Sequence, residues 1–202
     1  MANDWLDRYQ PTGETEEADV ARIRALLAGG GNPWSRVTSL HLTASALIVH
    51  PDSGRVLLRW HQRQRRWLQV GGHGDPGESD PLAIALREAR EETGLPDLRP
   101  WPDARLRHVV ICAVAPGKGE PAHEHADLRY VMATARPDAI AAEAADAPLR
   151  WLSFREARDL VGANNLQVTL DRAERALSGP GAPGHAGRSN DHHSREPSTR
   201  YS

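Results

Sequence analysis

Hydrophobic and polar residues alternate along the chain in patterns that predict strands and helices between residues 40 and 177. Apolar runs bounded by turn residues predict strands over 40–49, 55–60, 67–70, 105–115, 122–135 and 149–152. Apolar residues at helical spacing, together with capping residues, predict helices over 19–28, 81–93, 154–160 and from Asn164 or Asn165 to about 177. This order predicts an α/β fold in which helices pack on the faces of a mixed sheet.

The two ends of the chain differ from this central segment. Residues 1–18 are mostly polar, and we expect them to form a loose arm that leads into the short helix over 19–28. Residues 178–202 have no apolar periodicity and are rich in Gly, Pro and Ser, so we expect a disordered tail. The predicted organisation is an N-terminal arm and short helix over 1–39, a domain over 40–177 and a tail over 178–202.

The start and the end of the helix over 81–93 are encoded locally. Asp80 is a favourable N-cap, and Pro81 takes the first helical position, where a missing N–H costs nothing. Gly94 supplies the left-handed residue that commonly follows a helix. Helical spacing places an apolar stripe on the inward face, and its members are Leu82, Ala85, Leu86, Ala89 and Thr93.

Glu88, Glu91 and Glu92 stand at positions i, i+3 and i+4 of this helix, on a face away from that stripe. Like charges at this spacing repel one another by roughly a few tenths of a kcal/mol per pair. A divalent cation offsets such repulsion, because Mg²⁺ binds carboxylate oxygens and keeps waters and phosphates in its other positions. The alternative is a solvated acidic face balanced by neighbouring arginines. The glycine-rich segment 71–74 favours a ligand site, because glycine lets the backbone approach a ligand closely.

The segment 72–95 resembles the signature of the Nudix hydrolases. That signature consists of Gly, five residues, Glu, seven residues, Arg-Glu, an apolar residue, any residue, Glu-Glu, any residue, Gly and an apolar residue. The matching residues are Gly72, Glu78, Arg87, Glu88, Ala89, Glu91, Glu92, Gly94 and Leu95. One spacing differs, because eight residues and not seven separate Glu78 from Arg87, and this insertion leaves the role of Glu78 open.

The resemblance implies an α/β/α sandwich with a mixed sheet that hydrolyses a diphosphate linkage in a nucleoside diphosphate joined to another group. The cofactor that it implies is Mg²⁺ or Mn²⁺. The implied metal ligands are Gly72, Glu88, Glu91 and Glu92. The implied catalytic residues are Arg87, Glu88 and Glu91, with the arginine orienting a catalytic glutamate. The general base varies within the family, and Glu143 and Asp146 lie where some members place such an acid.

Candidate substrate contacts lie outside the signature. His123, His125 and Asp127 alternate along a predicted strand and therefore share one of its faces. Residues of these types line substrate pockets, bind transition metals such as zinc, or serve as hydrogen-bonded structural groups. Because no third histidine stands nearby at ligand spacing, zinc is the least favoured of these roles, and His123, His125 and Asp127 are candidates for substrate binding or structural hydrogen bonding. Arg59 is a further candidate for contact with a substrate phosphate.

Composition narrows the classes of partner and compartment. A net charge of −2 does not indicate binding to nucleic acid or to an anionic membrane, so the expected partner is a small nucleotide-type molecule. Cys112 is the only cysteine, which excludes an internal disulfide and favours a reducing compartment. The N-terminus lacks the features of a secretory signal, and no apolar run is long enough to span a bilayer. We therefore expect a cytoplasmic protein. The sequence does not indicate its oligomeric state.

Two rival functions share this fold. One is a catalytically silent nucleotide-binding sensor, against which the intact glutamates Glu88, Glu91 and Glu92 argue. The other is an isoprenoid diphosphate isomerase, which requires an active-site cysteine. Cys112 is the sole candidate, and its place in the apolar run 109–114 predicts a buried thiol in a strand.

Overall fold

A computed structural model describes residues 4–117 and 119–179, and in this part of the chain eight strands form one sheet. The strands are β1 (Leu40–His50), β2 (Arg55–His61), β3 (Arg66–Leu68), β4 (Val70–Gly72), β5 (Arg99–Pro100), β6 (His108–Val114), β7 (His123–Ala133) and β8 (Leu149–Ser153). The α-helices are α1 (Asp4–Asp7), α2 (Glu14–Ala28), α3 (Pro81–Thr93), α4 (Phe154–Val161) and α5 (Leu166–Ser178), with 3₁₀ turns at Pro51–Ser53 and Pro137–Ala139. None of the described helices is long and apolar enough to cross a bilayer.

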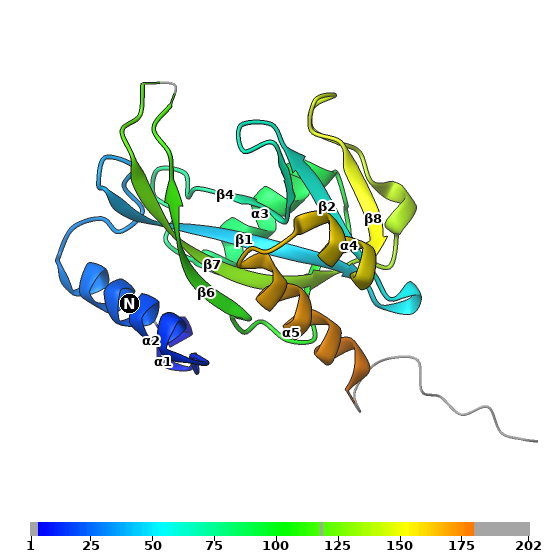
Figure 1. The fold of residues 1–202 in the computed structure, drawn as a ribbon, viewed down its shortest axis with the longest axis horizontal. Coiled ribbons are helices and arrows are strands. Elements are labelled where there is room, and N and C mark those ends of the chain that lie inside the picture. The colour runs from blue at the N-terminus through cyan, green and yellow to red at the C-terminus, as the bar shows by residue number, and fades with distance from the viewer. Residues whose placement is uncertain (1–3, 118, 180–202) are drawn as a thin grey trace, which may run out of the picture.

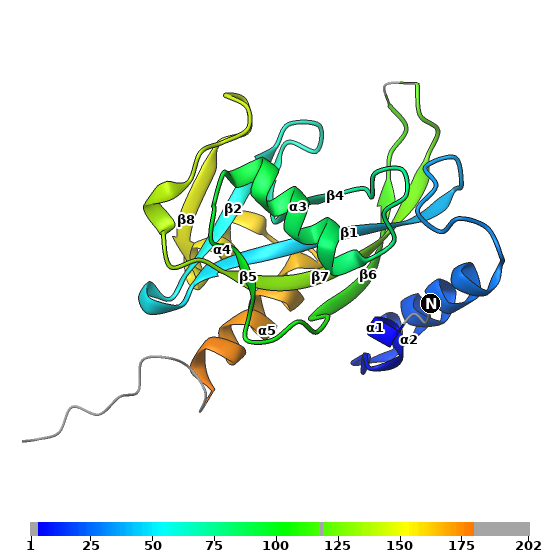
Figure 2. The ribbon, with the colours of Figure 1, turned by 180° about the vertical axis from the view of Figure 1, so that it is seen from behind.

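The sheet is mixed because β1 pairs in parallel with β7 and in antiparallel with β2 and β4. Strands β5 and β6 then extend the sheet beyond β7, and β8 pairs with β2. Helix α3 covers one face of the sheet, and α4 and α5 cover the other (Figures 1 and 2). The predicted α/β/α sandwich with a mixed sheet is confirmed.

Alternation along β1 and β7 divides the core between the two faces. Alternate residues such as Leu42 and Leu128 pack in the larger core beneath α3. The residues between them face α4 and α5, where Leu47 and Val131 are buried in a second apolar cluster. The first halves of both strands carry polar residues on this second face, and the structure has a hollow there.

The predicted strand over 67–70 is two short strands with different partners. Strand β3 pairs with β2, whereas β4 pairs with β1, so the chain changes partner at Gln69. Gly71 makes this possible, because its φ is +142° and a Cβ there would lie 2.4 Å from the Cβ of Ser45. The close approach of β4 to β1 thus requires glycine at this position.

The N-terminal arm was predicted wrongly as a loose segment. Helix α2 begins at Glu14 and not at Asp19, and Leu6 and Tyr9 are buried. The helix covers the free edge of β6, where the carboxylate of Glu16 accepts the N–H of Val109 at 3.4 Å. Asp19 accepts the N–H of Ile111 at 2.9 Å. Acidic residues that look solvated in sequence therefore satisfy the backbone donors of an edge strand.

Helix α3 has the ends that its sequence predicts. The side chain of Asp80 accepts the N–H of Leu82 at 2.9 Å, and the N–H of Gly94, at φ +67°, donates to the carbonyl of Arg90 at 2.8 Å. The inward stripe also contains Ile84, which the predicted stripe did not include. The fully buried members are Ile84, Ala85, Ala89 and Thr93, with Leu82 and Leu86 partly buried beside them. The stripe fixes α3 on the sheet and directs its glutamates towards β4.

Candidate active site

Arg87 joins the two halves of the signature. Its guanidinium donates to the carboxylate of Glu78, with Nη2 2.9 Å from Oε2, and to the backbone carbonyl of His73 at 2.9 Å. Nη1 of the same side chain lies 3.1 Å from Glu88 and 2.9 Å from Glu91. The loop before α3 therefore absorbs the inserted residue, and Glu78 still contacts the helix. These ion pairs lower the pKa of Glu78, chiefly through the hydrogen bond from Arg87.

Glu88 and Glu92 reach from α3 to the backbone of β4. The N–H of Gly71 donates to Oε2 of Glu92 at 2.9 Å, and a Cβ at Gly72 would lie 2.8 Å from the Cδ of Glu88. Any side chain at Gly72 would therefore fill the space that the Glu88 carboxylate occupies. The predicted ligands Gly72, Glu88 and Glu92 are brought together in this way.

Glu91 takes a different direction. Its side chain is 53% exposed and pairs with Arg87 instead of meeting the other two carboxylates. Within 4–117 and 119–179, three ligand atoms from His, Cys, Asp or Glu converge within 4.8 Å at His41, His123 and His125, and not at the α3 glutamates. The structure thus gathers two of the three predicted carboxylates and leaves the third at the rim.

The electrostatic environment of Glu88 and Glu92 favours the binding of a cation. Burial raises the pKa of Glu92 to about 7, with further increases from the charges of Glu88 and Glu143. Burial also raises the pKa of Glu88, and the charges of Glu91 and Asp75 add to that shift. Carboxylates held close together in a partly desolvated site are stabilised by a divalent cation with oxygen preference. The residues present therefore fit Mg²⁺ or Mn²⁺.

We expect the raised pKa of Glu92 to make the metal-free protein less stable as pH rises. The unfolded carboxyl loses its proton near pH 4.5, whereas the folded one keeps it until about pH 7. The wild type should therefore lose stability relative to Glu92→Gln between these two pH values. Urea unfolding of both proteins in chelator, from pH 4.5 to 8, measures the difference. Glu91→Gln is the matched control, and parallel curves for wild type and Glu92→Gln would contradict this assignment.

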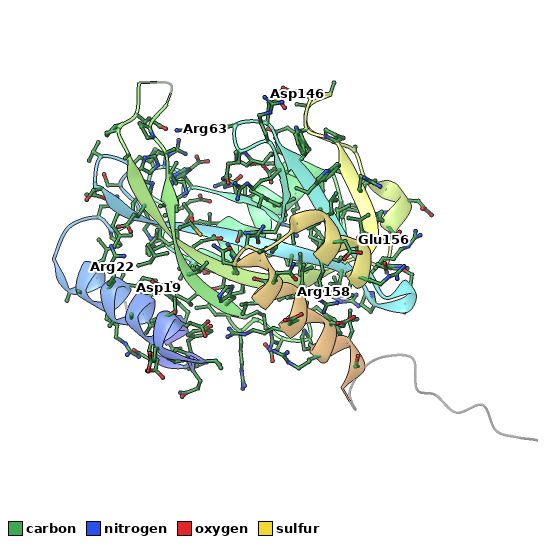
Figure 3. All side chains as sticks on the ribbon, viewed as in Figure 1. Asp19, Arg22, Arg63, Asp146, Glu156 and Arg158 are labelled. Atoms are coloured by element: carbon green, nitrogen blue, oxygen red, sulfur yellow. The ribbon has the colours of Figure 1, made fainter. Side chains whose placement is uncertain are left out.

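Arg59 on β2 connects one of the two candidate bases to the α3 glutamates. Nη1 of Arg59 is 3.0 Å from Glu92, and Nη2 is 3.3 Å from Glu143, so one guanidinium joins the two acids. Asp146 is exposed in the same loop as Glu143, before β8, and no described contact joins it to the α3 acids (Figure 3). Of the two acids predicted as bases, the structure brings Glu143 to the site.

The polar hollow on the α5 face has a volume of about 390 Å³ and includes Gly71 and Gly72 in its wall. Asp127 lies in it, where its carboxylate accepts from Ser45 at 3.0 Å and from Nε of Arg129 at 2.7 Å. The other polar residues of the wall are Thr43, His61, Gln64, Arg66, Gln69, His73, Cys112, His125, Asn164 and Asn165. The β2–β3 and β6–β7 hairpins contact one another beside the hollow. Nη1 of Arg63, labelled in Figure 3, lies in the first hairpin and is 2.9 Å from Glu120 in the second. Asp127 and His125, two of the three residues of β7 that were candidate substrate contacts, thus line a cavity.

Cys112 also borders this hollow and is only half-buried, which differs from the buried thiol expected. It does lie in a strand, β6, and Nδ2 of Asn165 donates to its sulfur at 3.2 Å. Burial raises the pKa of the Cys112 thiol, so the thiolate that a nucleophile requires is disfavoured.

Two histidines that sequence reasoning missed lie beside His123 and His125. His41 on β1 and His73 after β4 bring their Nε2 atoms to 3.1 Å from one another, and His73 lies 3.2 Å from His125. The parallel register, which pairs His41 with His125, is the cause. Burial lowers the pKa of His73 to about 3 and that of His125 to about 4. Spacing along the chain could not reveal this cluster, because its members come from three separate segments.

Comparison with known proteins agrees with the fold and the signature. A sequence model of the NUDIX domain matches residues 39–171. The chain is 31% identical over 154 residues to the "Probable DHNTP pyrophosphohydrolase" of Lactococcus lactis subsp. cremoris (strain MG1363), covering 72% of this chain and 84% of that relative.

Comparison with solved structures identifies the same fold. A hydrolase of the NUDIX family from Clostridium perfringens superposes with a TM-score of 0.51 at 25% identity, covering 68% of this chain and 96% of that one. A C. elegans Ap4A hydrolase in a binary complex gives a TM-score of 0.54 at 19% identity, covering 68% and 97%, and so shares the fold. With the domain match over residues 39–171 and the Glu88–Glu92 site on α3, the chain belongs to the Nudix hydrolase family.

Proposed function

We propose that the protein is a metal-dependent pyrophosphohydrolase that cleaves a diphosphate linkage in a nucleoside diphosphate joined to another moiety. The observation that carries the proposal is the meeting of Glu88 and Glu92 with the backbone of Gly71 and Gly72. This contact joins the acidic helix to β4, whose residues Gly71 and Gly72 also form part of the wall of the polar hollow. Family membership and the name of the Lactococcus relative support the same reaction class.

Glu88, Glu92 and the Gly72 carbonyl would hold Mg²⁺ or Mn²⁺, with Glu91 completing the set after it turns from Arg87. Such a cation neutralises phosphate charge and acidifies a water molecule when bound. Arg87 fixes the glutamates through charge-assisted hydrogen bonds, and it thereby keeps their carboxylates in the orientation that the reaction needs.

Removal of a proton from the attacking water requires a general base near Glu88 and Glu92. Glu143 is a suitable general base, because Arg59 holds it next to Glu92 and it is otherwise exposed to solvent. A substrate contact would come from Asp127 in the hollow.

A substrate screen tests this function. The protein is incubated with Mg²⁺ and with nucleoside triphosphates, DHNTP, Ap4A or nucleoside diphosphate sugars, and the released products are identified. These candidates include the compounds in the names of the Lactococcus and C. elegans proteins. We expect cleavage at a phosphate–phosphate bond of at least one class, and its loss in chelator. Binding without turnover across the whole set would favour the silent sensor instead.

We expect Cys112→Ala to leave hydrolysis within about threefold of the wild type, because the raised pKa keeps the thiol protonated. The measurement is kcat on the best substrate from the screen. An isoprenoid diphosphate isomerase needs its cysteine for chemistry, so that class predicts complete loss in the same variant. Asn165→Ala, which removes the partner of the thiol, is the control for changes in the shape of the hollow.

A further inference from the structure

Four histidine side chains meet at the N-terminal ends of β1 and β7. His41 is on β1, His123 and His125 are on β7, and His73 follows β4. The parallel register places His41 directly opposite His125, and the two histidines of β7 share a face because they are two residues apart. His41 is buried, with 1% of its surface exposed, and the other three are partly buried. The fold therefore builds a cluster from residues far apart in sequence.

Neighbouring rings of the cluster face one another through Nε2. The Nε2 atoms lie 3.1 Å apart for His41 and His73, 3.2 Å for His73 and His125, and 3.1 Å for His123 and His125. The Nδ1 atoms of two rings instead face backbone carbonyls. That of His41 lies 3.1 Å from the oxygen of Thr38, and that of His123 lies 2.9 Å from the oxygen of Pro121.

These contacts cannot all be hydrogen bonds. Nδ1 of His41 and of His123 must carry a proton to bond a carbonyl, which leaves a lone pair on each Nε2. His73 and His125 can each donate to one of those lone pairs. Their own Nε2 atoms then face one another at 3.2 Å as two N–H groups, and removing either proton breaks an outer bond. A conflict therefore remains in every neutral arrangement of the four rings.

A metal ion removes this conflict, because it takes up the lone pairs that face one another. One ligand nitrogen from each of His41, His123 and His125 lies within 4.8 Å of the other two, and His73 adjoins His41 and His125. Zn²⁺ binds imidazole nitrogen at about 2.0–2.1 Å in tetrahedral sites, which sets the nitrogen–nitrogen separation at about 3.3 Å. Three of the six separations among the four Nε2 atoms are close to this value, at 3.1, 3.2 and 3.1 Å. Metal-binding histidines also commonly donate their other N–H to a backbone carbonyl, as His41 and His123 do.

We propose that His41, His123 and His125 hold Zn²⁺, with His73 turning in from the loop after β4 as the fourth, tetrahedral ligand, at a site separate from the α3 carboxylates. Imidazole nitrogen suits zinc, whereas Mg²⁺ prefers oxygen ligands, so the two sites select different ions. The zinc ties the loop after β4 to the sheet. The carbonyl of His73 in that loop accepts from Arg87, so the ion holds one anchor of the signature helix. The inference stands on histidine geometry and does not depend on the proposed hydrolysis.

Cobalt provides the direct test, because Co²⁺ in a tetrahedral nitrogen site absorbs intensely in the visible range. Chelator-treated protein is titrated with Co²⁺ and then with Zn²⁺. We expect about one Co²⁺ per chain with tetrahedral absorption, its displacement by Zn²⁺, and a rise in Tm with Zn²⁺. His73→Gln and His125→Gln should lose the absorption and the Tm rise.

Three controls distinguish an ion bound by the four histidines from one bound elsewhere on the protein. His50→Gln alters a histidine at the far end of β1 that bonds Ser53, and it should keep the cobalt absorption. Glu88→Gln alters the proposed hydrolytic site and should also keep it, so failure of either site is recognised independently. The ring ¹⁵N signals of four histidines in the wild type should shift on addition of Zn²⁺. Absence of that shift, or cobalt absorption that persists in both cluster variants, would overturn the proposal.

Discussion

Glu92→Gln is expected to lower kcat by about 10²–10⁴-fold while leaving the fold intact. The substitution keeps the shape of the side chain and removes the charge that lies between Gly71 and Arg59. Glu91→Gln should also abolish metal-dependent turnover if its carboxylate joins the set when the cation binds. Turnover is measured at limiting Mg²⁺, and circular dichroism checks that each variant is folded.

The matched control for these variants is Glu17→Gln, an exposed glutamate of α2 that lies outside the signature. It should hydrolyse substrate at the wild-type rate. Full activity of Glu92→Gln or Glu91→Gln at limiting Mg²⁺ would count against the metal assignment. A defect that disappears at high Mg²⁺ would indicate weakened binding of the cation and would therefore support it.

Glu16→Gln is expected to destabilise the protein by about 3–5 kcal/mol, because it leaves a partly buried arginine without its counter-charge. Nη2 of Arg172 on α5 lies 2.8 Å from Glu16, and Tyr9 donates to the same carboxylate. The side chain of Glu16 is 6% exposed and that of Arg172 is 17% exposed. This pair joins the N-terminal helices to the last helix. Urea unfolding at pH 7 measures the loss.

An exposed ion pair in the same region provides the comparison. Arg22 of α2 pairs with Glu124 at 2.6 Å, with side chains 48% and 37% exposed, and Figure 3 labels the arginine. Arg22→Gln should cost at most about 1 kcal/mol, because water screens exposed pairs. Equal losses for Glu16→Gln and Arg22→Gln would show that burial of the first pair contributes nothing.

The pH dependence of the Glu16 pair has a defined sign. Burial alone would raise the pKa of Glu16, but hydrogen bonds from Arg172, Tyr9 and the backbone of Thr12 outweigh it and lower the pKa to about 2. A carboxyl whose folded pKa lies below its unfolded value of 4.5 stabilises the protein above pH 4.5. That contribution should be lost as the pH falls from 4.5 to about 2.

Features that depend on neighbouring residues were predictable from the sequence. Helix α3 begins and ends where Asp80 and Gly94 place its caps, because capping requires only the residues at each end. Features that depend on distant partners were not. The start of α2 depends on Glu16 meeting Arg172 and the edge of β6, and neither partner is visible in the local pattern.

The same distinction between local and distant partners applies to the residues of the candidate site. The signature on α3 identified Glu88 and Glu92, because their spacing on one helix fixes their relative position. Pairing of β1 with β7 brought His41 to His125, which spacing could not indicate. The rotation of Glu91 towards Arg87 likewise depends on side-chain contacts and not on helical spacing.

The position of a bound cation decides whether the α3 carboxylates form a metal site. Crystals of the protein are soaked in Mn²⁺, and anomalous scattering at the manganese edge locates the ion. We predict a peak between the carboxylates of Glu88 and Glu92 and the backbone of Gly72. Well-ordered glutamates with no anomalous peak beside them, or a peak confined to another part of the molecule, would contradict the proposed site.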